Sequence, residues 1–453
     1  MAENHDRAGE ARRIMIVGMA IVAVLFLFNS HYPSALQMAE LKIFDLRMYA
    51  RQAHPLKGDV IIVAIDDKSI VQLGRWPWPR TVLAQLTNAL RSYRAAVIGF
   101  DMVFSEHDYL DRHSQGPAAG RNKSGVATSS PDQTFADAIR AQGHTFVAYP
   151  FEAMTDADGQ ISPGFVTEVN NPPPLRYGSV KLADTALPPP LTEAIAYLPN
   201  LPLIDRAARG TAFFNAPSDL DGVFRSELMV MRFGKFYYEP FVVAVASAYL
   251  HTANVLTLSR YGVESVAIGP ISVPVDDQGR MLVNFRGPAH TFPYFSASDV
   301  IAHRIPPAAL ANKIVLVGAT AFGLGDKLST PMGADFPGVE VHANAIDNIL
   351  AGDFIQRSEM TLFLECVAAL LMGVMISAAV AYLPASCSCA ALIGMIVGYC
   401  ALVQYLLVTD GLLVGVLLPV ASTFITYAGL TSYRLYLTEA REKRLIAHAV
   451  SER

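Results

Sequence analysis

Residues 313–352 read KIVLVGATAFGLGDKLSTPMGADFPGVEVHANAIDNILAG, and this stretch decides the fold class of the region around it. It starts with KIVLVGA (313–319), a short continuous apolar run with β-branched residues, which is typical of a buried strand. VEVHANAIDNILAG (339–352) follows and predicts a helix. A buried strand followed by a helix is the repeating unit of a parallel sheet.

Similar units occur earlier in the chain. Buried strands are predicted over 59–65 (DVIIVAI), 95–100 (AAVIGF) and 144–150 (HTFVAYP), and helices over 79–93 and 132–142. Strands that alternate with helices in this way favour a largely parallel sheet that carries helices on both faces. We therefore expect an α/β domain with a mixed, largely parallel sheet.

The middle of this region shows a different pattern, which predicts an antiparallel extension of the sheet. GTAFFNAP (210–217) and VFRSELMVMRF (223–233), joined by SDLDG, are expected to form antiparallel strands, and ISVPVDDQGRMLVNF (271–285) a hairpin that turns at DDQG. DLDG (219–222) also resembles the start of a calcium loop, but the downstream ligands are missing, so we interpret it as a turn. The Gly-, Ser- and Ala-rich loop over 113–130 is expected to be mobile.

Polar residues follow the predicted strands at their carboxyl ends. Asp66 and Asp67 follow the strand at 59–65, Asp101 follows the strand at 95–100, and Thr320 and Asp326 follow the strand at 313–319. Ligands of open α/β sheets bind beyond these ends, so we expect these residues at one edge, with Asp66, Asp101 and Asp326 lining one pocket. The alternative is that each acid caps the helix or turn that follows it.

GRWPWPR (74–80) supplies two more ligand-binding candidates, Arg75 and Arg80. Their guanidinium groups could meet an anion or the acids of the sheet edge. The tryptophans of the same stretch could instead pack beneath the helix that starts there, because proline suits its first turn. No nucleophile elbow, phosphate-binding glycine loop or zinc pattern occurs in the sequence, so no catalytic or metal-binding residues are predicted.

Four apolar runs predict membrane spans, over 14–34, 359–383, 388–408 and 411–432. They separate a cytoplasmic N-terminus (1–13), an extracytoplasmic domain (35–358) and a cytoplasmic connecting helix (433–453). The first run could be a cleaved signal peptide, but it lacks a convincing cleavage site, which favours a retained anchor. Glu365, near the outer end of the second run, is expected to reach the interface rather than serve a proton relay.

Charges at the two ends predict the orientation. Arg7, Arg12 and Arg13 precede the first run, and Arg434 and Arg441 follow the last one, so both termini are expected in the cytoplasm. An even number of spans agrees with this assignment. The predicted location is the cytoplasmic (inner) membrane of a bacterium, with several spans and the large domain in the periplasm.

Composition excludes several other classes. The chain of 453 residues is 52% hydrophobic and only 17% charged, which suits a protein that is partly in lipid. A formal net charge of −5 gives no reason to expect nucleic acid as a partner. All four cysteines lie in the apolar C-terminal third, so the large domain is not a disulfide scaffold, and Cys387 and Cys389 lack the further ligands of a metal site.

Four motifs in order resemble the second class of CHASE domains, the cyclase/histidine-kinase-associated sensory extracellular domains of bacterial receptors. These motifs are IIVAIDDKSIVQLGRWPWPR (61–80), AAVIGFDMVFSE (95–106), DLDGVFR (219–225) and the stretch that opens this section. The resemblance covers about 35–355, and the family's order of one span, a sensor and three close spans also fits. It implies a cytoplasmic output domain, often a class III adenylate or guanylate cyclase, otherwise a histidine or serine/threonine kinase.

The resemblance also implies partners and cofactors. TEAREKRLIAHAVSER (438–453) looks like the connecting helix of a receptor adenylate cyclase, which makes cAMP from ATP. Such cyclases act as homodimers, and Mg and ATP would be needed only by the missing catalytic domain, so no cofactor is expected for this chain. We expect a truncated receptor rather than a stand-alone sensor, with an unknown extracytoplasmic stimulus and membrane lipid as further partners.

Two other functions stay open from the sequence. The clustered acids could bind a metal ion and activate water, which would make the chain a membrane-anchored extracytoplasmic enzyme. No histidine joins Asp66, Asp67, Asp101 or Asp326 in an obvious pattern, and one span would suffice as an anchor. A channel or transporter is less favoured, because the spans contain few charges and no signal of a broken helix.

Overall fold

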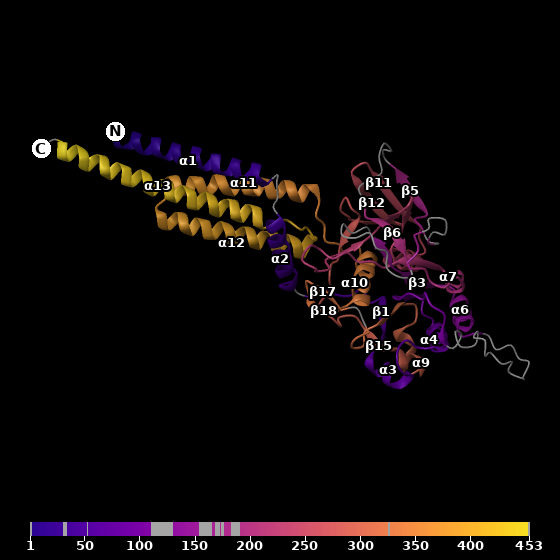
Figure 1. The fold of residues 1–453 in the computed structure, drawn as a ribbon. Coiled ribbons are helices and arrows are strands. Elements are labelled where there is room, and N and C mark those ends of the chain that lie inside the picture. The colour runs from indigo at the N-terminus through magenta and orange to yellow at the C-terminus, as the bar shows by residue number, and fades with distance from the viewer. Residues whose placement is uncertain are drawn as a thin grey trace, which may run out of the picture. The chain divides into compact units, whose positions relative to one another are not determined.

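The computed structural model describes residues 2–29, 34–51, 53–109, 130–153, 165–167, 173, 176–182, 191–324 and 327–451. The chain divides into two compact units (Figure 1). The helical unit comprises Met1–Arg51 and Gln356–Arg453, and the α/β unit comprises Gln52–Ile355. Apart from Ser130, the loop that is expected to be mobile lies outside the described residues.

The α/β unit is built on a six-stranded sheet with the order β15-β1-β16-β2-β3-β7. All its neighbouring strands are parallel, so the predicted parallel sheet is confirmed. The first strand pairs along its whole length with β16, from Val60 opposite Ile314 to Ile65 opposite Ala319. The strands are β1 (Val60–Ile65), β2 (Val97–Phe100), β3 (Thr145–Tyr149), β7 (Gly210–Phe213), β15 (Tyr294–Ser296) and β16 (Ile314–Ala319).

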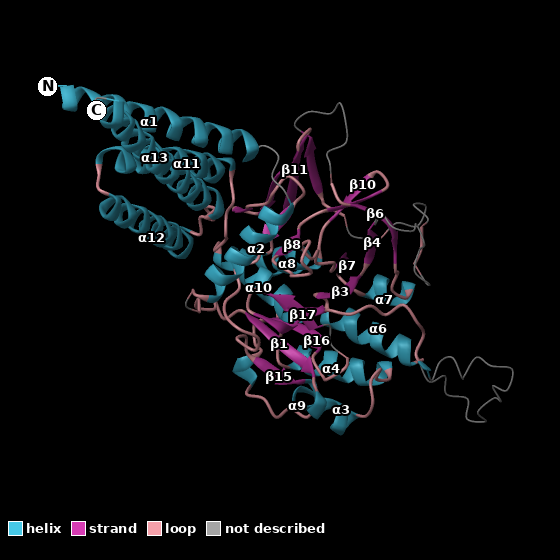
Figure 2. Cartoon of the chain, turned by 60° about the vertical axis from the view of Figure 1, so that its left-hand side comes forward, coloured by secondary structure: helices cyan, strands magenta, loops and turns pink. Residues whose placement is uncertain are grey.

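Helices cover both faces of this sheet, as expected (Figure 2). Alternate residues of one strand point to opposite faces, so β1 places Val60 and Ile62 in one core and Ile61 and Val63 in the other. The first core is completed by α8 (Phe241–Leu250) and α10 (Gly338–Ala351). The second core is completed by α3 (Asp67–Leu73), α4 (Arg80–Ser92), α6 (Pro131–Gln142), α7 (Pro202–Ala207) and α9 (Ala297–Ile301).

Two glycines let the helices of the first core approach the sheet closely. A Cβ on Gly99 of β2 would lie 2.6 Å from the ring of Phe241 in α8. A Cβ on Gly318 of β16 would lie 2.6 Å from the Val339 side chain in α10. These contacts leave no space for a larger residue, so α8 and α10 sit directly on the strands.

Smaller sheets extend the α/β unit. One has the order β10-β9-β6-β4, a second β13-β12-β11-β5, and two further pairs are β14-β8 and β17-β18. Their strands are β4 (Phe151–Ala153), β5 (Ser179–Leu182), β6 (Glu193–Tyr197), β8 (Ser226–Leu228), β9 (Met231–Phe233), β10 (Phe236–Tyr238), β11 (Asn254–Ser259), β12 (Gly262–Ile268), β13 (Ile271–Val273), β14 (Arg280–Leu282), β17 (Lys327–Thr330) and β18 (Gly333–Pro337). A short 3-10 helix, η1 (Pro307–Ala309), precedes β16.

The predicted partners of the middle strands are wrong, although strands form there. β7 joins the parallel sheet beside β3 and does not pair with 223–233. Within that segment, β8 pairs with β14, and β9 pairs with β6 and β10. The predicted hairpin does turn between Asp276 and Arg280, but its two strands pair with β12 and β8 instead of with each other. DLDG forms the predicted turn, in which the N–H of Gly222 donates to the carbonyl of Asp219 at 2.9 Å.

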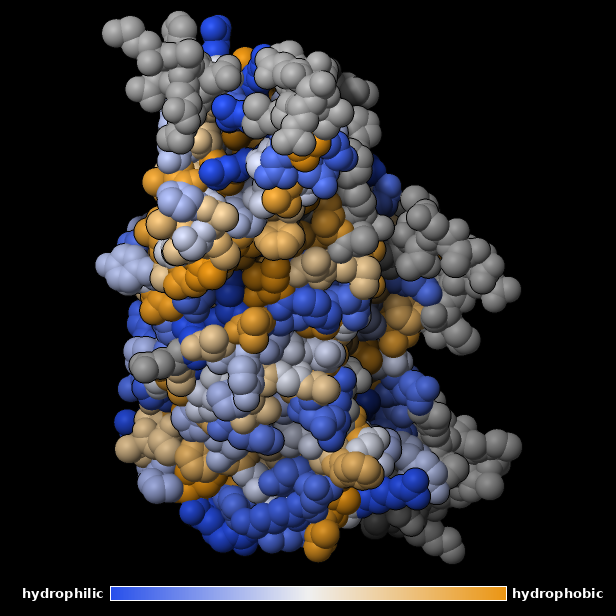
Figure 3. Space-filling model, turned by 90° about the vertical axis from the view of Figure 1, so that its left-hand side faces the viewer, coloured by the Kyte–Doolittle hydropathy of each residue, from blue (hydrophilic) through white to orange (hydrophobic). Residues whose placement is uncertain are grey.

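The helical unit contains α1 (Ala2–Asn29), α2 (Ser34–Tyr49), α11 (Glu359–Tyr382), α12 (Ala385–Asp410) and α13 (Leu417–Ser451). Among the described residues, α11 and α12 are long and apolar enough to cross a membrane. Large apolar side chains of both helices are exposed, such as Phe363 and Leu402. Hydrophobic residues also lie at the surface in the view of Figure 3. Residues 35–49, expected at the start of the outer domain, belong to α2 in this unit.

Small residues bring α1 and α11 together. A Cβ on Gly373 of α11 would lie 2.5 Å from the Val22 side chain of α1. A Cβ on Gly18 of α1 would lie 2.2 Å from the Ser377 hydroxyl, four residues after Gly373. Small residues four positions apart are a common packing motif of membrane helices, because they allow close backbone approach.

The segment 411–416 separates α12 from α13, so the helix of the fourth predicted span begins at Leu417. Glu365 accepts the N–H of Gly415 at 2.6 Å, and Glu40 of α2 accepts the N–H groups of Val416 and Leu417 at 2.9 Å each. Glu365 is buried in the protein, and its position relative to the membrane interface stays a prediction. A carboxylate at the start of a helix satisfies N–H groups that have no partner within the helix.

Candidate functional site

The carboxyl edge of the parallel sheet gathers several of the predicted site residues. Asp66 follows β1 and caps α3, accepting the N–H of Ser69 at 2.8 Å, and it also accepts the hydroxyl of Ser296 at the end of β15. Asp67 accepts the N–H of Phe322 at 3.2 Å. Thr320 follows the neighbouring strand β16 and donates its N–H to the carbonyl of Ile65 at 3.1 Å.

Asp66, Asp67 and Thr320 therefore lie at the ends of adjacent strands, as their positions predict. The contacts of the two acids are those of helix and loop capping, since each carboxylate accepts main-chain N–H groups. Asp326 lies outside the described residues, so a pocket that it shares with Asp66 and Asp101 stays a prediction.

Asp101 follows β2 at the same edge and faces a buried histidine. Its carboxylate lies 3.7 Å from Nε2 of His342 in α10. The other ring nitrogen, Nδ1, lies 2.8 Å from a carboxylate oxygen of Glu227 in β8. The rings of Phe214 and Phe241 meet the imidazole edge to face, with centroids 6.4 and 6.0 Å away.

This arrangement favours a charged imidazole. Burial lowers the pKa of His342, but the carboxylates of Glu227 and Asp101 outweigh it and raise that pKa to about 9. The histidine is 4% exposed and Glu227 is 1% exposed, so this ionic cluster is largely out of contact with water. At neutral pH, the imidazolium balances part of the charge of two acids that would otherwise be costly to bury.

Of the two predicted arginines, Arg80 contacts the loop that follows β2 and the first turn of α6. The guanidinium of Arg80 lies 4.7 Å from the centre of the Phe104 ring, donates to the carbonyl of Glu106 at 3.0 Å and lies 3.5 Å from the carboxylate of Asp132. Arg75 is exposed. Trp78 is buried in the same core as α4, and its indole N–H donates to the carbonyl of Gly74 at 2.8 Å, so this tryptophan does pack beneath the helix.

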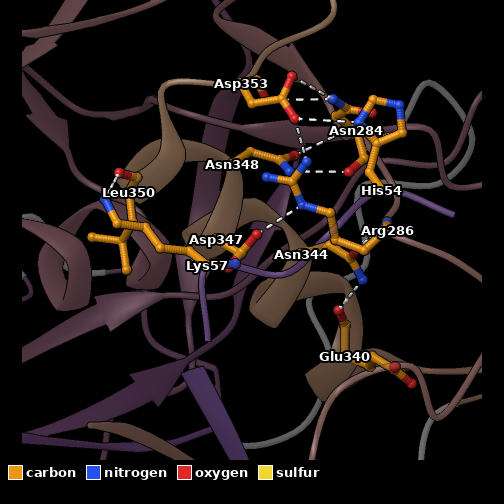
Figure 4. Close-up of polar contacts among 10 residues, drawn as sticks. All are labelled: His54, Lys57, Asn284, Arg286, Glu340, Asn344, Asp347, Asn348, Leu350 and Asp353. Atoms are coloured by element: carbon orange, nitrogen blue, oxygen red, sulfur yellow. Dashed lines mark hydrogen bonds and ion pairs between the residues drawn. The ribbon is translucent and has the colours of Figure 1, made fainter. Parts of the chain in front are cut away.

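A second buried cluster surrounds Arg286 (Figure 4). Its Nε lies 2.7 Å from Asp347 of α10, a second guanidinium nitrogen meets Asp353, and its main-chain N–H donates to Asn344 at 2.8 Å. Arg286 and Asp347 are at most 1% exposed. Charged hydrogen bonds of this kind are among the strongest that side chains form.

The same cluster ties together the first and the last residues of the α/β unit. The N–H of His54 donates to the carbonyl of Arg286 at 3.0 Å, and the N–H of Lys57 donates to Asp347 at 3.0 Å. The Lys57 ammonium also reaches the carbonyl of Leu350. Arg286 and Asp347 thus bind both the segment that enters this unit and the helix that leads out of it.

The start of α10 carries another buried acid. Glu340 accepts the main-chain N–H groups of His290, Thr291 and Phe292 at 2.8, 2.9 and 3.2 Å. It also accepts the hydroxyl of Tyr294 at 2.9 Å, and burial raises the pKa of that tyrosine, as does the nearby carboxylate. Glu340 therefore fixes the loop that leads into β15.

The sequence contained a signal for these clusters. The helix over 339–352 was predicted from its apolar residues, yet polar residues occur on two opposite faces of it, and the structure buries Glu340, His342, Asn344, Asp347 and Asn348. A helix surrounded by protein requires a partner for each such group. Among the described residues, no group of three or more His, Cys, Asp or Glu side chains is placed to hold a metal ion.

The α/β unit lies in the sequence between the two segments that form the helical unit. The chain belongs to the CHASE2 domain family, because residues 18–381 match the model of that family. CHASE2 domains are extracellular sensor domains of signalling receptors, so the suspected family is confirmed. No curated protein and no solved structure matches the chain.

Proposed function

We propose that this chain is the sensor and membrane-transducing part of a bacterial receptor that regulates a class III adenylate cyclase. The sensor domain would lie in the periplasm, and four spans would place both termini in the cytoplasm. Basic residues at both ends and four apolar runs support this orientation. The family match supports a sensor.

The observation that carries the transducing role is the continuity of α13. This helix runs without a break from Leu417 to Ser451, a length of 35 residues. Its apolar first part packs in the helical unit against α1 and α11, and its last part carries exposed charges such as Glu439 and Arg441. A continuous helix passes a rotation or shift from one end to the other, which suits a connection to an output domain.

The cyclase assignment rests on the likeness of 438–453 to cyclase connecting helices; a histidine or serine/threonine kinase is the alternative output. Class III cyclases act as dimers, so the receptor would be a homodimer. Mg and ATP would belong to the catalytic domain. A stimulus needs to supply only about 1.4 kcal/mol of difference between two states to change the output tenfold.

Cysteine labelling tests the orientation. In a variant without the four native cysteines, single cysteines would replace exposed Glu264 in the α/β unit and exposed Tyr436 in α13. A membrane-impermeant maleimide should label position 264 once the outer membrane is opened, and position 436 only after the inner membrane is broken. Labelling of both positions in intact spheroplasts would contradict the orientation.

A fusion tests the output. An adenylate cyclase catalytic domain would be joined after Arg453, and cAMP would be measured in bacteria that lack their own cyclase. One alanine inserted after Tyr436 rotates everything downstream by about 100°, and seven restore the facing to within about 20°. We expect one alanine to change cAMP at least about fivefold, because the helix couples the parts, and seven to restore it. Equal cAMP from all three proteins would show that α13 does not control the cyclase, and a response seen only with a kinase domain would favour the alternative output.

A further inference from the structure

A cavity of about 630 Å³ opens in the α/β unit away from the residues discussed above. Its size is within the range of sites for small organic ligands. It lies at the amino ends of two strands of the parallel sheet, because His144 directly precedes β3 and Arg209 directly precedes β7. The carboxyl-edge residues Asp66 and Asp101 are not among those that line it.

The end of α8 forms one wall of this cavity. His251 closes the helix in a left-handed conformation, with φ of 52°, and its N–H donates to the carbonyl of Ala248 at 3.3 Å. The N–H of Thr252 donates to the carbonyl of Ser247 at 3.1 Å. These bonds hold both side chains at the cavity, which α8 also lines with Ala244 and Ala248.

The exposed part of the cavity offers positive charge and N–H donors. The Arg209, His144 and His251 side chains are exposed, and the two imidazole rings lie with their centroids 6.5 Å apart. A guanidinium binds a carboxylate with two parallel hydrogen bonds, which makes arginine well suited to planar organic acids.

The buried part of the cavity offers donors as well. Glu239 is 4% exposed and accepts a hydrogen bond from the Asn254 amide, and burial raises its pKa to about 8. It is therefore mostly a neutral carboxylic acid at pH 7 and can donate its proton to a hydrogen bond. The Thr252 hydroxyl is buried and has no hydrogen-bond partner within the described part of the chain.

From this geometry, we infer that the cavity binds a small organic anion with one or more carboxylates. Arg209 and the two histidines hold a carboxylate at the rim, and Glu239 and Thr252 donate to a further oxygen deeper in the cavity. The Phe146 ring and three alanines contact the carbon skeleton. An inorganic ion would leave that apolar part of the wall without a partner, which favours an organic acid over free phosphate.

The binding site does not depend on the receptor's output. The inference rests on the proposed function only in treating the anion as the stimulus. α8 connects the cavity with the buried cluster around His342, since its last turn lines the cavity and its first residue, Phe241, contacts the His342 ring.

Calorimetry on the full chain in detergent micelles tests the site. The probes are acetate, succinate, citrate, inorganic phosphate and the diamine putrescine, each at up to 1 mM. We expect at least one carboxylate to bind at pH 7.5, and Arg209→Gln to weaken that binding at least tenfold. Arg206→Gln is the matched control, because Arg206 is an exposed arginine of α7 that does not line the cavity.

Titration of Glu239 supplies a second test. Between pH 7.5 and 9.5 its carboxyl group loses its proton, so the wild-type protein should bind the carboxylate at least tenfold more weakly at the higher pH. Glu239→Gln keeps a neutral donor at every pH, so this variant should show a smaller loss. Both proteins share His144, His251 and Arg209, the other titratable and charged groups of the cavity, and the buried Tyr149 and Tyr177 that interact electrostatically with position 239, so the difference between them isolates Glu239.

The outcomes separate the site from the receptor function. The inference would be overturned if no carboxylate bound, or if phosphate or putrescine bound more tightly than any carboxylate. It would also be overturned if Arg209→Gln bound the carboxylate as tightly as wild type, or if Glu239→Gln lost as much binding as wild type between pH 7.5 and pH 9.5. Carboxylate binding that meets both tests supports it. If the bound acid leaves the cAMP of the cyclase fusion unchanged, the site stands and its role as stimulus site fails.

Discussion

Replacing His342 with glutamine should remove a specific part of the pH dependence of stability. The imidazole lies between Glu227 and Asp101, which raise its pKa from an ordinary 6.5 to about 9 against the effect of burial. A group whose pKa is raised on folding stabilises the fold while it is protonated in the folded protein, and this stabilisation is lost as the pH rises through the folded pKa.

The magnitude follows from the two pKa values. Below pH 6 the protonated imidazole contributes about 3 kcal/mol to the free energy of unfolding, because one pKa unit corresponds to about 1.4 kcal/mol. The contribution shrinks as the pH rises above 7, and most of it is gone above pH 9. The wild-type protein should therefore lose about 2 kcal/mol between pH 7 and pH 9 that His342→Gln does not lose.

Urea unfolding followed by tryptophan fluorescence measures this difference. The chain has two tryptophans, Trp76 and Trp78, and both lie in the α/β unit, so the signal reports on the unit that contains His342. His303→Asn is the control, because His303 is exposed and asparagine tolerates its left-handed backbone, with φ of 53°. If wild type and His342→Gln lose stability in parallel between pH 7 and pH 9, the histidine is not held charged by the two acids.

Two further substitutions test the buried ion pair and the helix contact. Asp347→Asn removes the fully buried one of the two carboxylates that pair with Arg286, so it should lower the free energy of unfolding by up to about 3–5 kcal/mol in the same assay. Asp335→Asn, at an 80% exposed side chain, should cost less than about 0.5 kcal/mol, and equal losses would refute the argument. Gly373→Val places a Cβ 2.5 Å from a side chain of α1 and should lower the temperature at which the chain aggregates in detergent. Gly394→Val in α12, where an added Cβ would meet no atom beyond its own stretch of helix within 4 Å, should change it much less, and a larger effect at Gly394 would rule out this close helix contact.

The sequence predicted the parallel core well because its signal is local. Strands such as 59–65 and 313–319 are buried on both faces, so each is a continuous apolar run. Such a run can be recognised as a strand from its own residues, without knowing which strands pair with it. The small strands lack such a signal. β8, β9 and β14 have three residues each, and their partners are set by the packing of the whole unit, so the sequence misassigned their pairing.

The candidate sites were harder to predict for a related reason. The carboxyl edge was located because one rule places the ends of parallel strands together, and Asp66, Asp67 and Thr320 follow it. The cavity at the opposite ends of the strands draws Arg209 and Glu239 from separate segments, and no spacing in the sequence connects them. Their proximity exists only once the sheet has formed.

The position of α10 indicates how a signal would leave the α/β unit. This helix holds His342 between two acids and Asp347 against Arg286, and it also packs on α8. A change at α8 can either break one of these buried charge contacts or move α10 together with its partners. Breaking a buried pair costs about 3–5 kcal/mol, whereas a tenfold change in output needs only about 1.4 kcal/mol of ligand energy. Movement of α10 together with Arg286 and the segment at Lys57 is therefore the lower-energy response, and it carries the first and last residues of the unit together.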